Sequence, residues 1–69
     1  MDKLTLFKLA CEKAANESLT IWKDKKVFLL WDNKTEYTVC SEDNLATVMK
    51  AEPNLTNVGA FFNGKPITK

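Results

Sequence analysis

The chain has 69 residues, of which 45% are hydrophobic and 28% are charged. This composition excludes a disordered chain and is typical of a globular protein, and the length allows one domain, over residues 1–69, with a limited core. No apolar run approaches the roughly 20 residues that a membrane-spanning helix needs. The N-terminus also lacks the pattern of a secretory signal, so we expect a cytoplasmic protein that makes no contact with a membrane.

Ten basic and nine acidic residues give a net charge of +1, and the chain contains no histidine. Every basic residue is a lysine, so the bidentate guanidinium contacts that usually read phosphates and guanine edges are missing. Nearly neutral charge without arginine disfavours nucleic acid as the main partner. A composition rich in lysine and asparagine is also typical of AT-rich genomes, which include many phages and mobile elements.

Residues suited to catalysis or metal binding are scarce. Without histidine, the commonest general base and the Ser–His and Cys–His nucleophile pairs are excluded. Cys11 and Cys40 form no CxxC motif, so we expect buried thiols rather than a zinc site, with a disulfide between the two as the less favoured alternative. The carboxylate pairs Asp32/Glu36 and 42–43 are more simply turn, strand and helix-start residues. We therefore predict a protein that is not an enzyme and that holds no cofactor and no metal.

The first predicted element is a helix over residues 3–16. Asp2 precedes it as an N-cap, and Leu4, Phe7, Cys11 and Ala14 recur at helical spacing. This apolar stripe is expected to pack on the rest of the chain.

Period-two patterns of β-favouring residues then predict three strands, over 19–22, 27–31 and 36–40. The segments 23–26 and 32–35 have the composition of turns, which indicates an antiparallel meander. A two-residue loop at 33–34 and a four-residue loop at 23–26 place six apolar side chains on one face of this sheet. They are Leu19, Ile21, Phe28, Leu30, Tyr37 and Val39.

A second helix is predicted after Ser41, which would cap it, and before Pro53. A strand over 58–62, a hairpin turn at Asn63-Gly64 and a short returning strand over 65–68 follow. The fold class is therefore α+β, a small single domain of order α-β-β-β-α-β(-β). Both helices are expected on the sheet face that carries Leu19, Phe28 and Tyr37.

The other face of the predicted sheet is apolar as well, because it carries Trp22, Val27, Leu29 and Trp31. Two interpretations follow. The chain covers this face with its own C-terminal segment, from Leu55 through Val58 to Phe61 and Phe62. Otherwise the face stays exposed and docks on a partner, with Phe61 and Phe62 as further anchors. The preferred function is a small non-catalytic protein-interaction module, such as an accessory or inhibitor protein of a phage or mobile element. It would use the Trp-containing face to bind a protein partner or a second copy.

An alternative function comes from the lysines beside the two tryptophans. Aromatic rings interleaved with lysines are the minimal equipment for gripping single-stranded nucleic acid. Trp22 and Trp31 would stack on bases here, and four lysines would contact the phosphates. They are Lys23, Lys25, Lys26 and Lys34.

Overall fold

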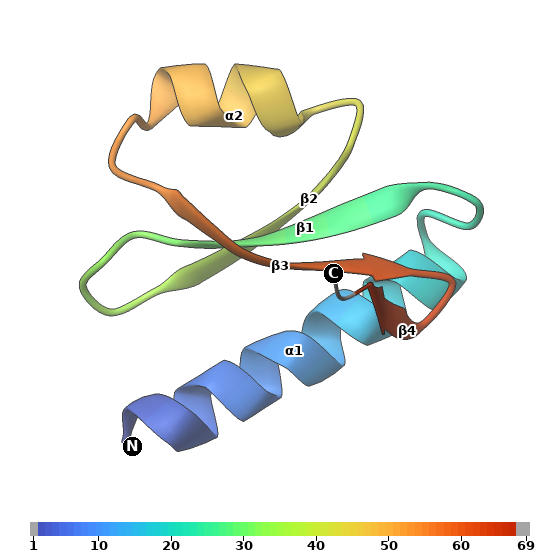
Figure 1. Ribbon diagram of the computed structural model, residues 1–69, viewed down its shortest axis with the longest axis horizontal. Coiled ribbons are helices and arrows are strands. Elements are labelled where there is room, and N and C mark those ends of the chain that lie inside the picture. The colour runs from blue at the N-terminus through green and yellow to red at the C-terminus, as the bar shows by residue number, and fades with distance from the viewer. Residues whose placement is uncertain (1, 68–69) are drawn as a thin grey trace.

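The computed structural model describes residues 2–67, which form two helices and four strands (Figure 1). In chain order these are α1 (Lys3–Thr20), β1 (Lys26–Trp31), β2 (Tyr37–Ser41), α2 (Leu45–Ala51), β3 (Thr56–Phe62) and β4 (Lys65–Ile67). The predicted α+β class is confirmed. The order of elements is α-β-β-α-β-β, because one predicted strand belongs to a helix.

The four strands form one antiparallel sheet in the order β2-β1-β3-β4, and the helices cover opposite faces of it (Figure 1). Successive side chains of a strand point to opposite faces. Accordingly, Leu29 packs against Ala14 of α1, whereas Leu30 packs in the cluster that includes Val48 of α2. The prediction of both helices on one face is therefore wrong, because β1 is apolar on both sides and each side needs its own cover.

Helix α1 extends four residues beyond its predicted end, so the predicted strand over 19–22 is wrong. Ser18 is fully buried and continues the stripe that Ala14 belongs to, one turn further along the helix. The hydroxyls of Ser18 and Thr20 donate to the carbonyls of Ala15 and Asn16, both at 2.8 Å. Burial of this face outweighs the weak preference of the segment for a strand. No helix within residues 2–67 is both long and apolar enough to cross a membrane.

The connection between β1 and β2 spans residues 32–36 and is longer than the predicted two-residue loop. The Asp32 carboxylate Oδ1 accepts hydrogen bonds from the backbone N–H groups of Lys34, Thr35 and Glu36, at 2.8, 2.9 and 3.1 Å. Asn33 adopts a left-handed φ of 67° within this loop. Asp32 thereby satisfies the backbone groups of a wider turn, which its acceptor geometry favours.

This loop shifts the pairing of β1 with β2 by one residue. Trp31 lies opposite Tyr37 and Leu29 lies opposite Val39, where the predicted register paired Leu30 with Tyr37. A one-residue shift moves every side chain of a strand to the other face. Tyr37 and Val39 therefore lie on the α1 side of the sheet, and the predicted six-residue face does not form.

We expect acid to weaken the 32–36 loop through Asp32. Hydrogen bonds from the backbone N–H of Glu36 and then Lys34 hold the pKa of the Asp32 carboxyl below its ordinary value of 3.8. A group with a lowered folded pKa contributes stability above its unfolded pKa and loses it as the pH falls through the folded value. Asp32→Ala should therefore lower the melting temperature at neutral pH and flatten its fall below about pH 4. Thermal melts followed by circular dichroism test this, and identical pH dependence in both proteins would contradict it.

The β3–β4 hairpin confirms the predicted turn at Asn63-Gly64. These residues have φ values of 49° and 87°, the left-handed pair that a two-residue hairpin turn requires. The Gly64 N–H donates to the Ser18 hydroxyl at 2.8 Å, which ties the hairpin to α1. Residues 65–67 form the returning strand, and residue 68 of the predicted strand lies outside the described residues.

The remaining predictions concern the second helix and the third strand. Helix α2 forms between Leu45 and Ala51, but Ser41 is the last residue of β2 and Asn44 precedes the helix. Strand β3 starts at Thr56, two residues earlier than predicted. Its pairing with β1 is irregular between Leu29 and Leu30, which leaves Val58 as an unpaired bulge residue.

Candidate functional site

The apolar face predicted as a docking surface lies under α1. Val27 and Leu29 have no exposed surface, and both belong to the core cluster that includes Ala14 and Phe61. The expectation that Val27 and Leu29 lie exposed is therefore wrong, because α1 rather than a partner covers this face. The interpretation in which the chain covers its own second face is right about the cover and wrong about the segment. Helix α1 covers this face, whereas the C-terminal segment pairs beside β1 as β3.

The two tryptophans do not form one exposed patch. Trp22 precedes β1 and Trp31 ends it, so the two side chains lie at opposite ends of the strand, and each is half-buried. The Trp31 ring stacks on Tyr37 with a centroid distance of 6.1 Å and an interplanar angle of 19°. Lys3 of α1 places its Nζ 6.0 Å from the centroid of the same indole. These contacts make Trp31 part of the packing between α1 and the sheet.

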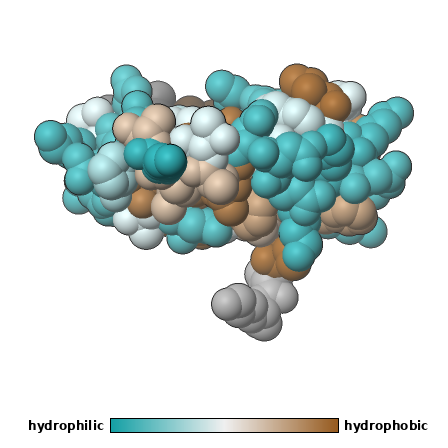
Figure 2. All heavy atoms as spheres, turned by 90° about the horizontal axis from the view of Figure 1, so that it is seen from above, coloured by the Kyte–Doolittle hydropathy of each residue, from teal (hydrophilic) through white to brown (hydrophobic). Residues whose placement is uncertain are grey.

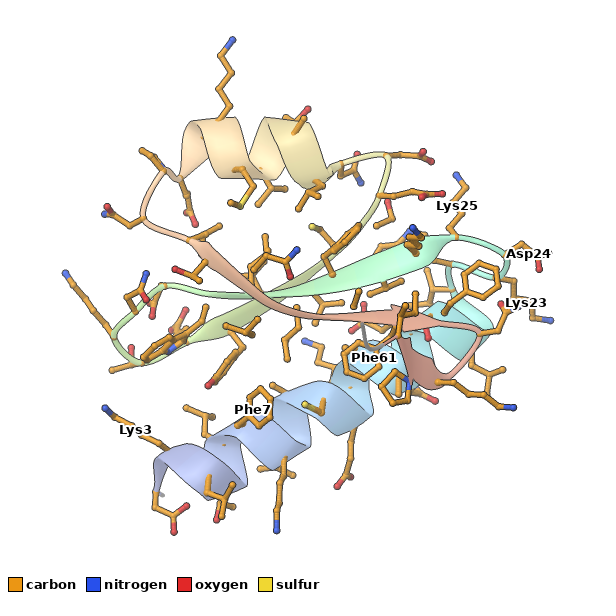
Figure 3. All side chains as sticks on the ribbon, in the orientation of Figure 1. Lys3, Phe7, Lys23, Asp24, Lys25 and Phe61 are labelled. Atoms are coloured by element: carbon orange, nitrogen blue, oxygen red, sulfur yellow. The ribbon has the colours of Figure 1, made fainter. Side chains whose placement is uncertain are left out.

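The lysines predicted to bind nucleic acid are divided between the two ends of β1. Lys23 and Lys25 lie in the α1–β1 connection (Figure 3). Lys26 begins β1 beside them, whereas Lys34 lies in the 32–36 loop. Lys25 forms an ion pair with Asp43, and this hydrogen bond raises the pKa of Lys25. The basic residues therefore form no continuous stripe beside the tryptophans.

Phe61 and Phe62, the two further anchors predicted from the sequence, lie in different environments. Phe61 is 6% exposed and belongs to the core, whereas Phe62 is 39% exposed on the other face of β3. Figure 2 shows the molecule from the α2 side, where apolar atoms show in small separate areas among hydrophilic ones. Large contiguous apolar patches are the ones that mark docking sites, so this view offers none.

The two edges of the sheet differ in what they offer to another strand. At the β2 edge, the Asp32 N–H donates to the Glu36 carbonyl and the Glu42 N–H donates to the Lys26 carbonyl. The pairs 32/36 and 26/42 are therefore hydrogen-bonded pairs at the two ends of the β1–β2 ladder. Bonded and non-bonded pairs alternate in an antiparallel ladder, so Thr38 and Cys40 point their backbone groups toward β1. Tyr37 and Val39 therefore point their N–H and C=O groups outward. Within residues 2–67, β2 pairs only with β1, so these groups have no strand partner.

The opposite edge, β4, is closed to strand pairing. Phe62 and Lys65 flank the two-residue turn and form a hydrogen-bonded pair. The backbone groups of the next residue, Pro66, therefore point away from β3. Proline has no N–H to donate, and a lysine beside it further discourages pairing. By contrast, β2 contains neither proline nor a charged residue between Tyr37 and Ser41.

A groove runs along the open β2 edge, between this strand and α1. It has a volume of about 260 Å³. Tyr37 and Val39, both half-buried, form one wall, and the half-buried Leu6 and Ala10 of α1 form the other. Lys13 and Glu36 line the rim of this α1–β2 groove. An apolar channel beside unpaired backbone groups is the arrangement in which strand-adding domains bind an extended peptide.

A second hollow, of about 330 Å³, lies between α1 and the β3–β4 hairpin. Phe7 of α1 and Phe61 of β3 lie on its walls (Figure 3), together with Cys11 and Pro66. Burial raises the pKa of the Cys11 thiol, which makes it a poor nucleophile. The walls of this hollow are almost entirely apolar, so few polar groups are available to orient a ligand. Among the described residues, no group of three or more His, Cys, Asp and Glu side chains is placed to hold a metal ion.

Sequence reasoning missed the β2 edge. The signal that was present is the contrast between residues 37–41, which carry no charge and no proline, and residues 65–67, which carry both. Comparisons with protein-family models, with curated proteins and with solved structures returned no match to this chain.

Proposed function

We propose that this chain is a non-catalytic protein-interaction module that binds an extended segment of another polypeptide by strand addition at β2. The observation that carries the proposal is the outward direction of the backbone groups of Tyr37 and Val39 beside the α1–β2 groove. Main-chain hydrogen bonds supply affinity in this binding mode, and side-chain pockets supply specificity.

The groove indicates the chemistry of the bound segment. A strand added to β2 directs alternate side chains toward α1, because successive residues of a strand alternate between faces. Those side chains meet Leu6, Ala10 and Val39, so apolar residues are favoured there. The residues between them point to the α2 side, next to the exposed Thr38, where polar residues are tolerated. The favoured segment is therefore free of proline and apolar at alternate positions, with polar residues between them.

Single-stranded nucleic acid is the weaker candidate. Trp31 stacks on Tyr37, and Asp43 pairs with Lys25, so these side chains already have partners within the chain. A nucleic-acid complex would weaken steeply with added salt, since counterions are released on binding. We expect no electrophoretic shift with single-stranded DNA or RNA at low salt.

The strand-addition proposal is tested by selecting binders from a library of extended peptides and mapping them by NMR. The expected binders are apolar at alternate positions and shift the amide signals of Tyr37 and Val39. Val39→Pro removes the outward N–H but leaves the bonds of Thr38 and Cys40 to β1, so it should abolish binding. Val39→Ala is the matched control, because it shortens the side chain and keeps the N–H.

We expect Val39→Ala to retain measurable binding and Val39→Pro to lose it, while both variants keep the circular dichroism spectrum of the folded chain. Binders whose shifts map away from β2, or equal binding by the two variants, would overturn the proposal.

A further inference from the structure

We propose that the strand added to β2 is β2 of a second copy of this chain, paired antiparallel about a two-fold axis at Thr38. This inference rests on the proposed function, because it assigns the occupant of the same edge. The two four-stranded sheets would join into one continuous sheet, with the two α1 helices on the same side of it.

The strand itself has the chemistry that the edge requires. Residues Tyr37 to Ser41 are uncharged and contain no proline, and the apolar Tyr37 and Val39 alternate on the α1 side. A two-fold interface uses the same patch on both chains, so a strand that fits its own edge satisfies both halves at once.

The outward backbone groups select the register. A two-fold axis at Thr38 pairs Tyr37 of each copy with Val39 of the other, and the N–H and C=O groups that this needs have no strand partner in the part of the chain that the structure describes. An axis at Val39 would instead pair Tyr37 with Ser41, whose carbonyl already accepts from the Asn44 N–H at 3.0 Å. The axis at Thr38 therefore makes the better use of the open edge.

Side-chain pairing across the interface points to the same register. The axis at Thr38 places Tyr37 opposite Val39 on the α1 side and Thr38 opposite its own copy on the other side. Aromatic–β-branched pairs and Thr–Thr pairs are both favourable across strands. The axis at Val39 would place Glu36 opposite Glu42, and both are exposed acidic residues. Directly opposed like charges are destabilising.

The flank of α1 above the groove offers additional surface to a second copy. Leu6, Leu9 and Lys13 are spaced three and four residues apart, so they share one side of the helix. Leu9 is 47% exposed and lies one turn of the helix from Leu6, which lines the groove. A second copy docked at β2 would bring its own α1 toward this flank. A chain of this size gains stability from such association, because its own core is limited.

Cross-linking of Thr38→Cys tests the register. Residues on the two-fold axis form a non-hydrogen-bonded pair, with Cα atoms about 4.5 Å apart, which a disulfide can bridge. We expect mild oxidation to convert this variant to a covalent dimer in which peptide mapping finds the two introduced cysteines joined. Thr47→Cys, on the exposed surface of α2, is the control and should form no covalent dimer, because its cysteine lies away from the paired strands. Cys11 and Cys40 are present in both variants, so their background reaction is the same.

A disulfide between the introduced cysteine of one copy and Cys40 of the other would overturn the register. If Thr38→Cys formed no more covalent dimer than Thr47→Cys, the pairing at this edge would be overturned. Light scattering adds the oligomeric state. The unmodified chain should have twice the mass of one chain at high concentration, and Thr38→Lys should have the mass of one chain, because it opposes two lysines on the axis.

The two proposals fail separately. If the chain is monomeric at all concentrations while selected peptides still bind at β2, the second copy is excluded as the occupant and strand addition stands. If peptides bind elsewhere and no dimer forms, strand addition itself is excluded.

Discussion

Leu29→Ala is expected to lower the free energy of unfolding by about 2–5 kcal/mol, which is a large fraction of the stability of an ordinary small domain. Leu29 has no exposed surface and belongs to the cluster of buried residues between the sheet and α1. Truncating this side chain loses the free energy that burial of its methyl groups contributes, and it leaves a cavity under α1.

Urea denaturation followed by circular dichroism measures this effect. Leu4→Ala is the matched control. Leu4 is 63% exposed near the start of α1, so its truncation should change stability by less than about 0.5 kcal/mol. The comparison shows whether Leu29 is a core residue, as its burial indicates, or an exposed docking residue, as the sequence predicted. If Leu29→Ala were as stable as the unmodified chain, α1 could not be packed over β1 as described.

Phe61→Ala should be the second strongly destabilising substitution, at about 3–5 kcal/mol. Phe61 is 6% exposed, lies opposite Val27 in the sheet and packs in the same cluster under α1. The next residue supplies the control. Phe62 is 39% exposed on the opposite face of β3, so Phe62→Ala removes the same atoms from a site that water already reaches.

We expect Phe62→Ala to cost about 1–2 kcal/mol, less than Phe61→Ala, since a smaller part of the side chain is buried. The same denaturation measurement tests both variants. Equal effects of the two substitutions would show that the two faces of β3 are covered to the same extent, contrary to the observed packing.

Several features of the fold could be predicted from the sequence because local chemistry decides them. The core positions Phe7, Cys11 and Ala14 follow from helical spacing, whereas Leu4 of the same predicted stripe is 63% exposed. The turn at Asn63-Gly64 follows from its need for two left-handed residues. The α+β class follows from the alternation of these patterns along the chain.

The arrangement of the sheet could not be predicted, because its causes lie outside the pattern of apolar residues. Asp32 caps three backbone N–H groups, and the resulting longer loop moves Tyr37 and Val39 to the α1 face. Ser18 reads as a break in the apolar pattern of α1, although it is buried and bonded to the β3–β4 hairpin. Local reading of the sequence does not reveal these contacts.

The candidate site was hidden for a related reason. Which strand has a free edge depends on the pairing of β1 with β3, and these strands are joined only through a long connection that contains β2 and α2. Once β3 takes its place beside β1, β2 is left at one edge and β4 at the other. The absence of proline and charge in residues 37–41 then becomes meaningful, because among the strands of residues 2–67 β2 is the edge that offers both donors and acceptors to another strand.

The most direct test of docking at the β2 edge is amide hydrogen exchange, followed by NMR on the unmodified chain from millimolar to micromolar concentration. If a second copy pairs with this edge, the N–H groups of Tyr37 and Val39 exchange slowly in concentrated solution and faster on dilution. The N–H groups of Thr38 and Cys40, which bond to β1, exchange at the same rate throughout. Fast exchange of Val39 at every concentration would contradict the account, because the edge would then be open to water alone.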